Sequence, residues 1–247
     1  KPQRAGGLTW NTTFVFAYNK SKLLELFGNT QNIGTDYVVG KPLFLVQAAP
    51  FAGINAATGR AMWLDSAGNL TYQIQTPRDN RILGDQLPEY TGGLTNTFTY
   101  KGFSLDVFFQ YEYGRLVSDG QINFLSETSG RINWLKEVYD NRWTTPGQVT
   151  SVPRMNLYAE QKNSGAQGGS RMWYKGDYVR LKYVTLSYDL PTSIANRLRM
   201  SAVKFYVQGT NLYTFADSPS YDPEFQGAGT GQIPQAKNYT VGLQIGF

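Results

Sequence analysis

The sequence predicts an all-β protein: an antiparallel transmembrane β-barrel segment of about seven or eight strands with long extracellular loops. Three observations lead to this prediction. They are a surplus of aromatic residues and glycine, side chains that alternate with a period of two, and an alternation of short and long links. The 247 residues include 17 Tyr, 14 Phe, 5 Trp and 26 Gly but only 4 Met. This composition favours strands over helices.

Hydropathy excludes a membrane protein built from helices. The mean hydropathy is -0.38, and Gln47 or the Pro and Gly residues interrupt the longest apolar stretches. None of these stretches approaches the about 18 apolar residues that a spanning helix needs. Any membrane crossing therefore has to be made by strands.

Alternation is clearest in three segments, 8–19, 91–100 and 103–114. The two-residue turn Lys101-Gly102 joins the last two of them into a predicted hairpin. Large apolar side chains occupy one face of each segment, and we expect lipid to cover that face. The predicted lipid-facing residues are Trp10, Phe14, Phe16, Tyr18, Phe103, Leu105, Val107, Phe109 and Tyr111.

The opposite face of 103–114 carries Asp106, Gln110 and Glu112, which we expect to set the polarity of a pore. Three more strands are predicted at 177–190, 201–212 and 238–247, the first with a bulge near Tyr183, where the alternation changes phase.

A seventh, weaker strand is predicted at 37–48, where Gly40 and Pro42 interrupt it. Residues 51–64 are a candidate eighth strand. Short links are expected at 101–102 and 191–200, with one of intermediate length at 20–36. Long links are expected at 65–91, 115–176 and 213–237. Transmembrane barrels have this asymmetry, with short periplasmic turns and long outer loops, and up-and-down order then places Phe247 at the periplasmic end.

Seven strands cannot close a bacterial barrel, because such barrels have even strand numbers and an open sheet edge leaves backbone groups unpaired in hydrocarbon. With residues 51–64 as a strand, a small closed barrel is arithmetically possible. The loops, however, are longer than a small barrel needs. We therefore expect residues 1–247 to be the C-terminal part of a larger barrel, with its other strands on polypeptide that is not in this sequence.

Two alternatives remain open at this point: a soluble carbohydrate-binding β-sandwich and a passive porin-like barrel. A sandwich buries its apolar face against a second sheet and favours Val, Ile and Leu, whereas here aromatic residues mark both ends of the apolar faces. The predicted strands also have about 10 residues, the length that crosses a bilayer at a tilt. A plug domain upstream of Lys1 would distinguish an importer from a porin.

The missing residue types argue against an enzyme. The chain has no His and no Cys, so it has no Ser-His-Asp triad, thiolate nucleophile or His/Cys metal site. The only acid cluster, Glu127, Glu137, Asp140 and Glu160, is expected to be a solvated loop surface. Asp65, Asp79 and Asp85 are too sparse for a calcium site. We therefore predict no catalytic residue, metal or cofactor. Without a clustered Lys/Arg run, the net charge of +5 does not indicate a nucleic-acid partner.

A series of phrases in the sequence resembles the C-terminal part of the SusC/RagA-like family of TonB-dependent outer-membrane transporters of Bacteroidetes, and the resemblance covers nearly the whole chain. The phrases are Trp10-Asn11-Thr12-Thr13-Phe14, Ile82-Leu83-Gly84, Pro88-Glu89-Tyr90-Thr91-Gly92-Gly93, Tyr100-Lys101-Gly102-Phe103-Ser104-Leu105, Asn141-Arg142-Trp143-Thr144, Val152-Pro153-Arg154, Tyr178-Val179-Arg180-Leu181-Lys182, Tyr206-Val207-Gln208-Gly209-Thr210-Asn211-Leu212 and Tyr221-Asp222-Pro223-Glu224.

The resemblance implies a barrel of roughly 22 strands with an N-terminal plug, located in the outer membrane. It implies a SusD-like surface lipoprotein as partner, energy supplied through TonB by the absent N-terminal part, and import of oligosaccharides or peptides. The terminal strand resembles the signal read by the barrel assembly machinery. The residues of this signal are Tyr239, Val241, Leu243, Ile245 and Phe247.

Aromatic and arginine side chains in the long links are candidates for contact with a substrate or with the lipoprotein, since aromatic rings stack on sugars and arginine binds carboxylates. For any one of them, packing within the loops is the simpler interpretation. The candidates are Trp134, Arg142, Trp143, Arg154, Trp173, Tyr174, Tyr221 and Phe225.

Overall fold

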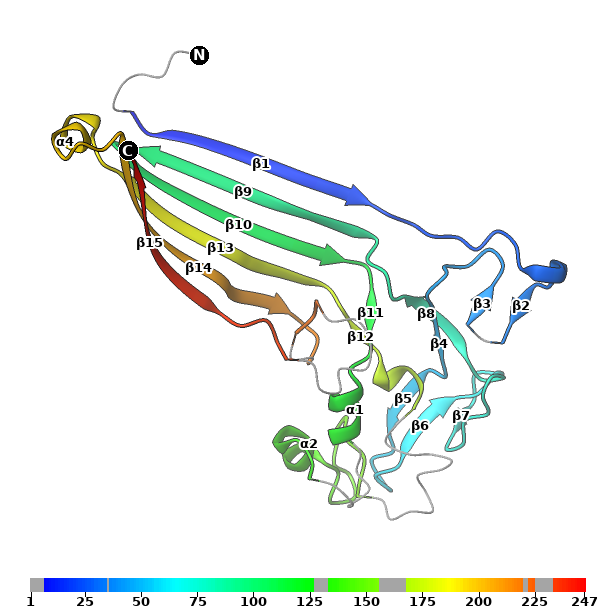
Figure 1. Cartoon of the computed structure of the whole chain (residues 1–247). Coiled ribbons are helices and arrows are strands. Elements are labelled where there is room, and N and C mark those ends of the chain that lie inside the picture. Colours follow the sequence, from blue (N-terminus) through cyan, green and yellow to red (C-terminus); the bar gives the residue numbers. More distant parts are fainter. Residues whose placement is uncertain (1–6, 35, 127–132, 156–167, 220–221, 225–232) are drawn as a thin grey trace.

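The computed structural model describes residues 7–34, 36–126, 133–155, 168–219, 222–224 and 233–247. Its main element is a six-stranded antiparallel sheet, here called the wall, in which strands that follow one another along the chain lie side by side (Figure 1). The strands of the wall are β1 (Thr9–Tyr18), β9 (Tyr90–Tyr100), β10 (Phe103–Tyr113), β13 (Tyr178–Asp189), β14 (Ala202–Ala216) and β15 (Asn238–Gly246).

The two ends of the wall differ in the length of their connections. The Lys101-Gly102 turn and a segment with the short helix α4 (Thr192–Arg197) lie at one end, where the C-terminus also lies (Figure 1). The connections 19–89, 114–177 and 217–237 lie at the other end. The predicted asymmetry between short turns and long loops is confirmed.

Strand register separates apolar from polar residues across the whole width of the wall. One row of paired positions is apolar on all six strands: Trp10, Phe98, Leu105, Leu186, Val207 and Val241. The next row is polar on all six: Asn11, Thr97, Asp106, Thr185, Gln208 and Thr240. Successive side chains of a strand point to opposite faces, so the wall has one apolar face and one polar face.

The apolar face is uncovered by the part of the chain that the structure describes. Trp10 is 65% exposed, and Phe14, Phe205 and Val241 are exposed as well. All nine predicted lipid-facing residues lie on this face, by their register with Phe98, Leu186 and Val207. A water-soluble sandwich would cover such a face with a second sheet. Contact of this face with lipid stays a prediction.

A β-bulge interrupts the middle of the wall where the sequence alternation changes phase. Phe108 pairs with Tyr183 and Phe109 with Leu181, which leaves Lys182 as the extra residue of β13. The bulge predicted near Tyr183 is therefore confirmed. Strand β14 has a matching irregularity at Asn211, whose φ is +53°, and continues beyond it to Ala216.

The connection 19–89 forms the larger part of a loop region beyond the wall. Its elements are η1 (Phe27–Asn29), β2 (Asn32–Ile33), β3 (Tyr37–Val38), β4 (Leu45–Ala48), β5 (Phe51–Ile54), β6 (Ala61–Leu64), β7 (Leu70–Thr71) and β8 (Arg81–Asp85). The connection 114–177 adds β11 (Leu116–Val117), α1 (Gly120–Leu125), α2 (Lys136–Asn141), η2 (Gly169–Met172) and β12 (Tyr174–Lys175). None of the helices that the structure describes is long and apolar enough to cross a membrane.

A small core holds the two connections together. Trp63 of β6 is fully buried with Ala49 and Ala61. The backbone N–H of Ser170 in η2 donates to the Ala49 carbonyl at 2.8 Å, and the Ser170 hydroxyl accepts from the Phe51 N–H at 2.9 Å. The loop region is therefore a packed unit with its own interior.

Two predicted strands are wrong. Residues 37–48 do not form a strand of the wall. The chain turns at Gly40 (φ +83°), and this turn divides the segment into β3 and β4. Residues 51–64 form the β5 and β6 hairpin around Trp63. Since β1 then pairs directly with β9, its chain direction is opposite to the predicted one, and the link at 20–36 belongs to the long-loop end.

Candidate functional site on the polar face of the wall

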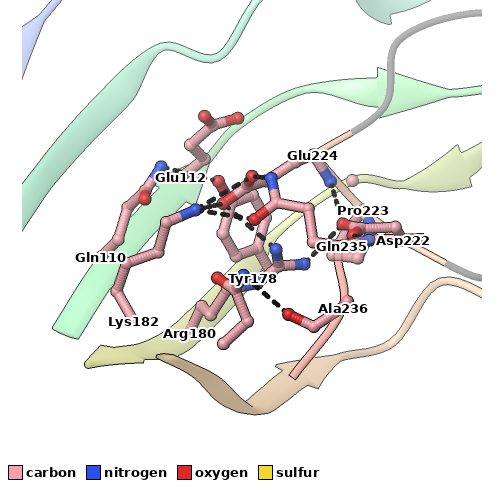
Figure 2. Close-up of polar contacts among 12 residues, drawn as sticks. Gln110, Glu112, Tyr178, Arg180, Lys182, Asp222, Pro223, Glu224, Gln235 and Ala236 are labelled. Carbon is pink, nitrogen blue, oxygen red and sulfur yellow. Dashed lines mark hydrogen bonds and ion pairs between the residues drawn. The ribbon is translucent and has the colours of Figure 1, made fainter. Parts of the chain in front are cut away.

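The most densely charged site lies on the polar face of β13, next to the long loops. Figure 2 shows residues 222–224, from the connection between β14 and β15, beside Arg180 and Lys182 of β13. An Asp222 oxygen lies 2.5 Å from Nη2 of Arg180, and Glu224 Oε1 lies 3.4 Å from its Nη1. Lys182 Nζ donates to Glu224 Oε1 at 2.8 Å. We call these four residues the ion-pair cluster.

Asp222 is buried and holds its own segment in shape. One carboxylate oxygen accepts from the Glu224 N–H and the other from the Gln235 N–H, both at 3.0 Å. Burial acts to raise the pKa of Asp222, but the hydrogen bonds from Arg180, Gln235 and Glu224 outweigh it, so this pKa is lower than its ordinary value. Asp222 is therefore ionised at neutral pH and fastens two parts of the connection 217–237 to β13.

A second arginine fastens the same connection from β10. Arg115 is buried just after β10; its Nε donates to the Gly176 carbonyl at 3.3 Å, and Nη2 donates to the Pro223 carbonyl. Nη2 also lies 3.3 Å from Glu112 Oε2. Arg115 thus joins the strand end, the connection 114–177 and the connection 217–237.

The burial of the two arginines limits their access to ligands. Arg115 and Arg180 are each only 3% exposed, and their guanidinium groups contact carboxylates or carbonyls of the chain itself. A dissolved anion would have to displace a carboxylate of the chain to reach Arg180. The ion-pair cluster therefore anchors the connection 217–237 to β13 at the long-loop end of the wall. A ligand would contact the surfaces around the cluster.

Two of the predicted contact residues, Trp143 and Arg154, join the two long connections. The Trp143 indole N–H donates to the Ala56 carbonyl at 2.9 Å, and the Arg154 N–H donates to the Gly59 carbonyl at 2.9 Å. Gly59 has φ +70°, and a Cβ there would come within 2.4 Å of the Trp143 ring. This packing gives Trp143 a structural role that needs no ligand. Contact of Trp143 with a substrate stays a prediction.

The other predicted loop residues lie in different contacts. Arg142 stacks on Tyr139 of α2 with its guanidinium carbon 3.9 Å from the ring centre, and Trp134 packs against the same ring. Trp173 is half-buried after η2, and the Tyr174 hydroxyl donates to Asn123 of α1 at 3.1 Å. Tyr221, Phe225, Glu127 and Glu160 lie outside the described residues.

The acidic residues of the connection 19–89 serve its fold. Asp79 is fully buried and accepts from the N–H groups of Gln75 at 2.7 Å and Ser66 at 3.0 Å and from Arg78 Nε at 3.0 Å. These hydrogen bonds, the one from Gln75 foremost, lower its pKa. Within the described ranges, no three His, Cys, Asp or Glu residues converge as metal ligands would.

The terminal strand forms one edge of the wall. Tyr239, Val241, Leu243 and Ile245 project from its apolar face in register with β14, and Phe247 is exposed at its end. On the polar face, the Tyr206 ring lies over Gly242, where a Cβ would come within 2.2 Å of it. The strand therefore has the form predicted for an assembly signal, and that role stays a prediction.

Comparison with known proteins assigns the wall to a class of proteins. No protein-family model matches the chain. TonB-dependent receptor P3 of Formosa agariphila is 28% identical over 97% of the chain, and receptor P26 of the same bacterium is 26% identical over 99%. The chain is homologous to TonB-dependent receptors. It spans only 27% and 28% of the length of these two relatives.

Solved structures agree with this assignment. The chain superposes on the RagAB peptide transporter with a TM-score of 0.83 and 24% identity over 99% of its length. The RagAB peptide importer in its closed-closed state gives the same TM-score with 26% identity and covers 99% of this chain and 28% of that one. The predicted SusC/RagA-like barrel segment is thus confirmed in fold and in homology to TonB-dependent receptors.

The sequence does not reveal the ion-pair cluster of this chain. Both of its halves stand in the family phrases, Arg180 with Lys182 and Asp222 with Glu224, but nothing in these phrases indicates that the two halves pair. A partial signal was available, because two cations at alternating positions of a strand share one face. Their partners lie 42 residues away along the chain, and one sequence does not show that pairing.

Proposed function

We propose that the chain is the C-terminal part of the barrel of an outer-membrane nutrient importer. The main support is that paired residues form apolar and polar rows in turn across the wall, so that one face is apolar and the other polar. The chain is also homologous to TonB-dependent receptors. In this proposal lipid covers the apolar face, and the polar face lines the lumen. The ion-pair cluster then lies at the extracellular mouth of the lumen.

The proposed partners come from the resemblance and the relatives. They are the remaining strands and plug of the same receptor, a SusD-like surface lipoprotein over the long loops, and TonB, which would contact the N-terminal part of the receptor. The proposed substrates are oligosaccharides or peptides. The structural likeness to a peptide transporter supports the peptide alternative, and the loops carry aromatic side chains that would suit either class.

Uptake by cells tests the importer against the passive porin. Cells that produce the whole receptor are supplied with labelled oligosaccharides and labelled oligopeptides, with and without TonB. We expect uptake of one class to fall without TonB to the level of cells that lack the receptor. Uptake that persists without TonB would support the porin instead.

Electrophoresis tests the barrel against the soluble sandwich. A barrel in detergent resists SDS until it is boiled, so we expect the whole receptor to migrate at two positions, one before and one after heating. A water-soluble receptor fraction with a single position would contradict the proposed membrane wall.

A further inference from the structure

An exposed apolar arm extends from the end of β1. The arm comprises residues 20–44, of which Thr35 is outside the described residues. Backbone hydrogen bonds hold it together, from the Leu23 N–H to the Lys41 carbonyl at 2.8 Å and from the Gly40 N–H to the Leu23 carbonyl at 2.7 Å. Figure 1 shows η1, β2 and β3 of this arm projecting beyond the end of β1.

Six large apolar side chains of the arm are exposed. Phe27 is 96% exposed, at the tip of the arm in η1. The exposed apolar side chains of the arm are Leu24, Phe27, Ile33, Tyr37, Leu43 and Phe44. Six exposed apolar side chains within one short segment favour an interaction site.

Lipid is a poor cover for the arm. The apolar face of β1 ends at Tyr18, and the arm begins beyond that aromatic residue. Charged residues Lys22, Glu25 and Lys41 lie among the apolar ones and are exposed as well. Burying such charges in hydrocarbon is costly, so the arm is better suited to a protein surface that leaves its charges in water.

The free edge of β1 points to the protein that supplies this surface. In the described chain β1 pairs only with β9, and its other edge faces no strand. Backbone groups on that edge need partners within a membrane, so another strand of the receptor must lie there. In an antiparallel barrel that strand begins at the long-loop end, and a loop leads into it beside Lys20.

We propose that the arm docks onto the extracellular loop that leads into the barrel strand paired with the free edge of β1 in the same receptor molecule. This inference rests on the proposed function. The chain spans 27% to 29% of its relatives, so most of such a receptor lies outside the sequence. The arm then locks the outer loops of the two parts of the barrel together.

Photo-cross-linking in the whole receptor tests the proposal. The photoreactive residue p-benzoylphenylalanine replaces Phe27 in cells, and the irradiated outer membranes are analysed by electrophoresis and mass spectrometry. We expect a product of monomer mass that joins position 27 to peptides preceding Lys1. The same replacement at Val149, which is 93% exposed in the connection 114–177, should not produce that product.

Other outcomes overturn the proposal. A product enlarged by the mass of a lipoprotein would show that the lipoprotein covers the arm, and a product of twice the receptor mass would indicate a second copy. Absence of any protein cross-link at position 27 would also reject it. Because the heat shift and TonB-dependent uptake are measured separately, a failed cross-link leaves the importer proposal standing.

A pair of matched substitutions provides a second measurement. Phe27→Asp should make the arm several-fold more sensitive to added protease on intact cells, since the charge weakens docking. Val149→Asp replaces a similarly exposed apolar residue and should leave cleavage of the arm unchanged. Equal cleavage in both variants would contradict docking of the arm.

Discussion

The wall and the loop region differ in where their large apolar side chains lie. In the wall, large apolar residues such as Phe14, Phe205 and Val241 are exposed, although each strand is hydrogen-bonded to the strand beside it. In the loop region, Trp63 and Val46 are almost completely buried although the strands are short. In the proposed membrane barrel, lipid would cover the apolar face of the wall, whereas the loop region buries its apolar side chains in its own interior.

The largest predicted effect concerns that interior. Trp63→Ala should lower the stability of the loop region by about 3–5 kcal/mol, because it leaves a large cavity between the two long connections. Hydrogen exchange of residues 45–64 in the whole receptor would measure the loss. Leu70→Ala, at an exposed position, should change exchange there by less than about 0.5 kcal/mol. Equal effects would mean that Trp63 does not organise the region.

A charge on the apolar face tests the wall. Val207→Arg should destabilise the receptor in a lipid bilayer by about 2–4 kcal/mol if the position lies near the midplane. The neighbouring Gln208→Arg lies on the polar face and should cost much less, even though Gln208 donates to Thr185 at 2.9 Å. Reversible urea unfolding in vesicles gives both values. A negligible effect of Val207→Arg would show that water, not lipid, covers this face.

The smallest effect concerns the anchor between the two regions and appears only in acid. The pKa of Asp222 is lower in the folded protein than its ordinary value of 3.8. The stabilisation from its ion pair is therefore complete above pH 3.8 and is lost as the pH falls through the folded pKa. The rate of pepsin cleavage between β14 and β15, divided by the rate of pepsin on an unfolded substrate at the same pH, should rise only below pH 3.8.

Asp222→Asn serves as the control for the acid experiment. The amide cannot ionise, so cleavage should be faster than in the unaltered protein above pH 3.8, should approach the unaltered rate in stronger acid, and should lose most of its pH dependence. Acceleration already at pH 5 in the unaltered receptor would contradict the assigned direction of the pKa shift.

The wall was largely predictable from sequence. All six strands were predicted close to their observed bounds, because a sheet with one apolar and one polar face imposes alternation on each strand. The main difference is β14, predicted to end at 212 and observed to continue to Ala216. At Asn211 the backbone takes a positive φ, and the alternation that signals a strand is interrupted there.

The loop region and the candidate site were less predictable. Leu45, Val46, Ala48 and Ala49 are buried nearly in succession, which conceals the direction of each side chain, and 37–48 was therefore mistaken for a wall strand. The ion-pair cluster depends on contacts between distant segments, and such pairings leave no local pattern. Trp143 is a conspicuous aromatic residue of a long link, but nothing in the sequence near it indicates that it contacts Ala56 and Gly59.

The bulge at Lys182 has a consequence for insertions and deletions in β13. The residues on either side of it follow opposite parity, with Arg180 and Tyr183 both directed to the polar face. Deleting Lys182 would thus convert β13 into an uninterrupted two-residue repeat and leave every remaining side chain on its present side. Deleting a residue elsewhere in the strand would move the side chains on one side of the deletion to the opposite face. Deleting Lys182 should therefore disturb the facing of β13 side chains least, although it would remove the ion pair with Glu224.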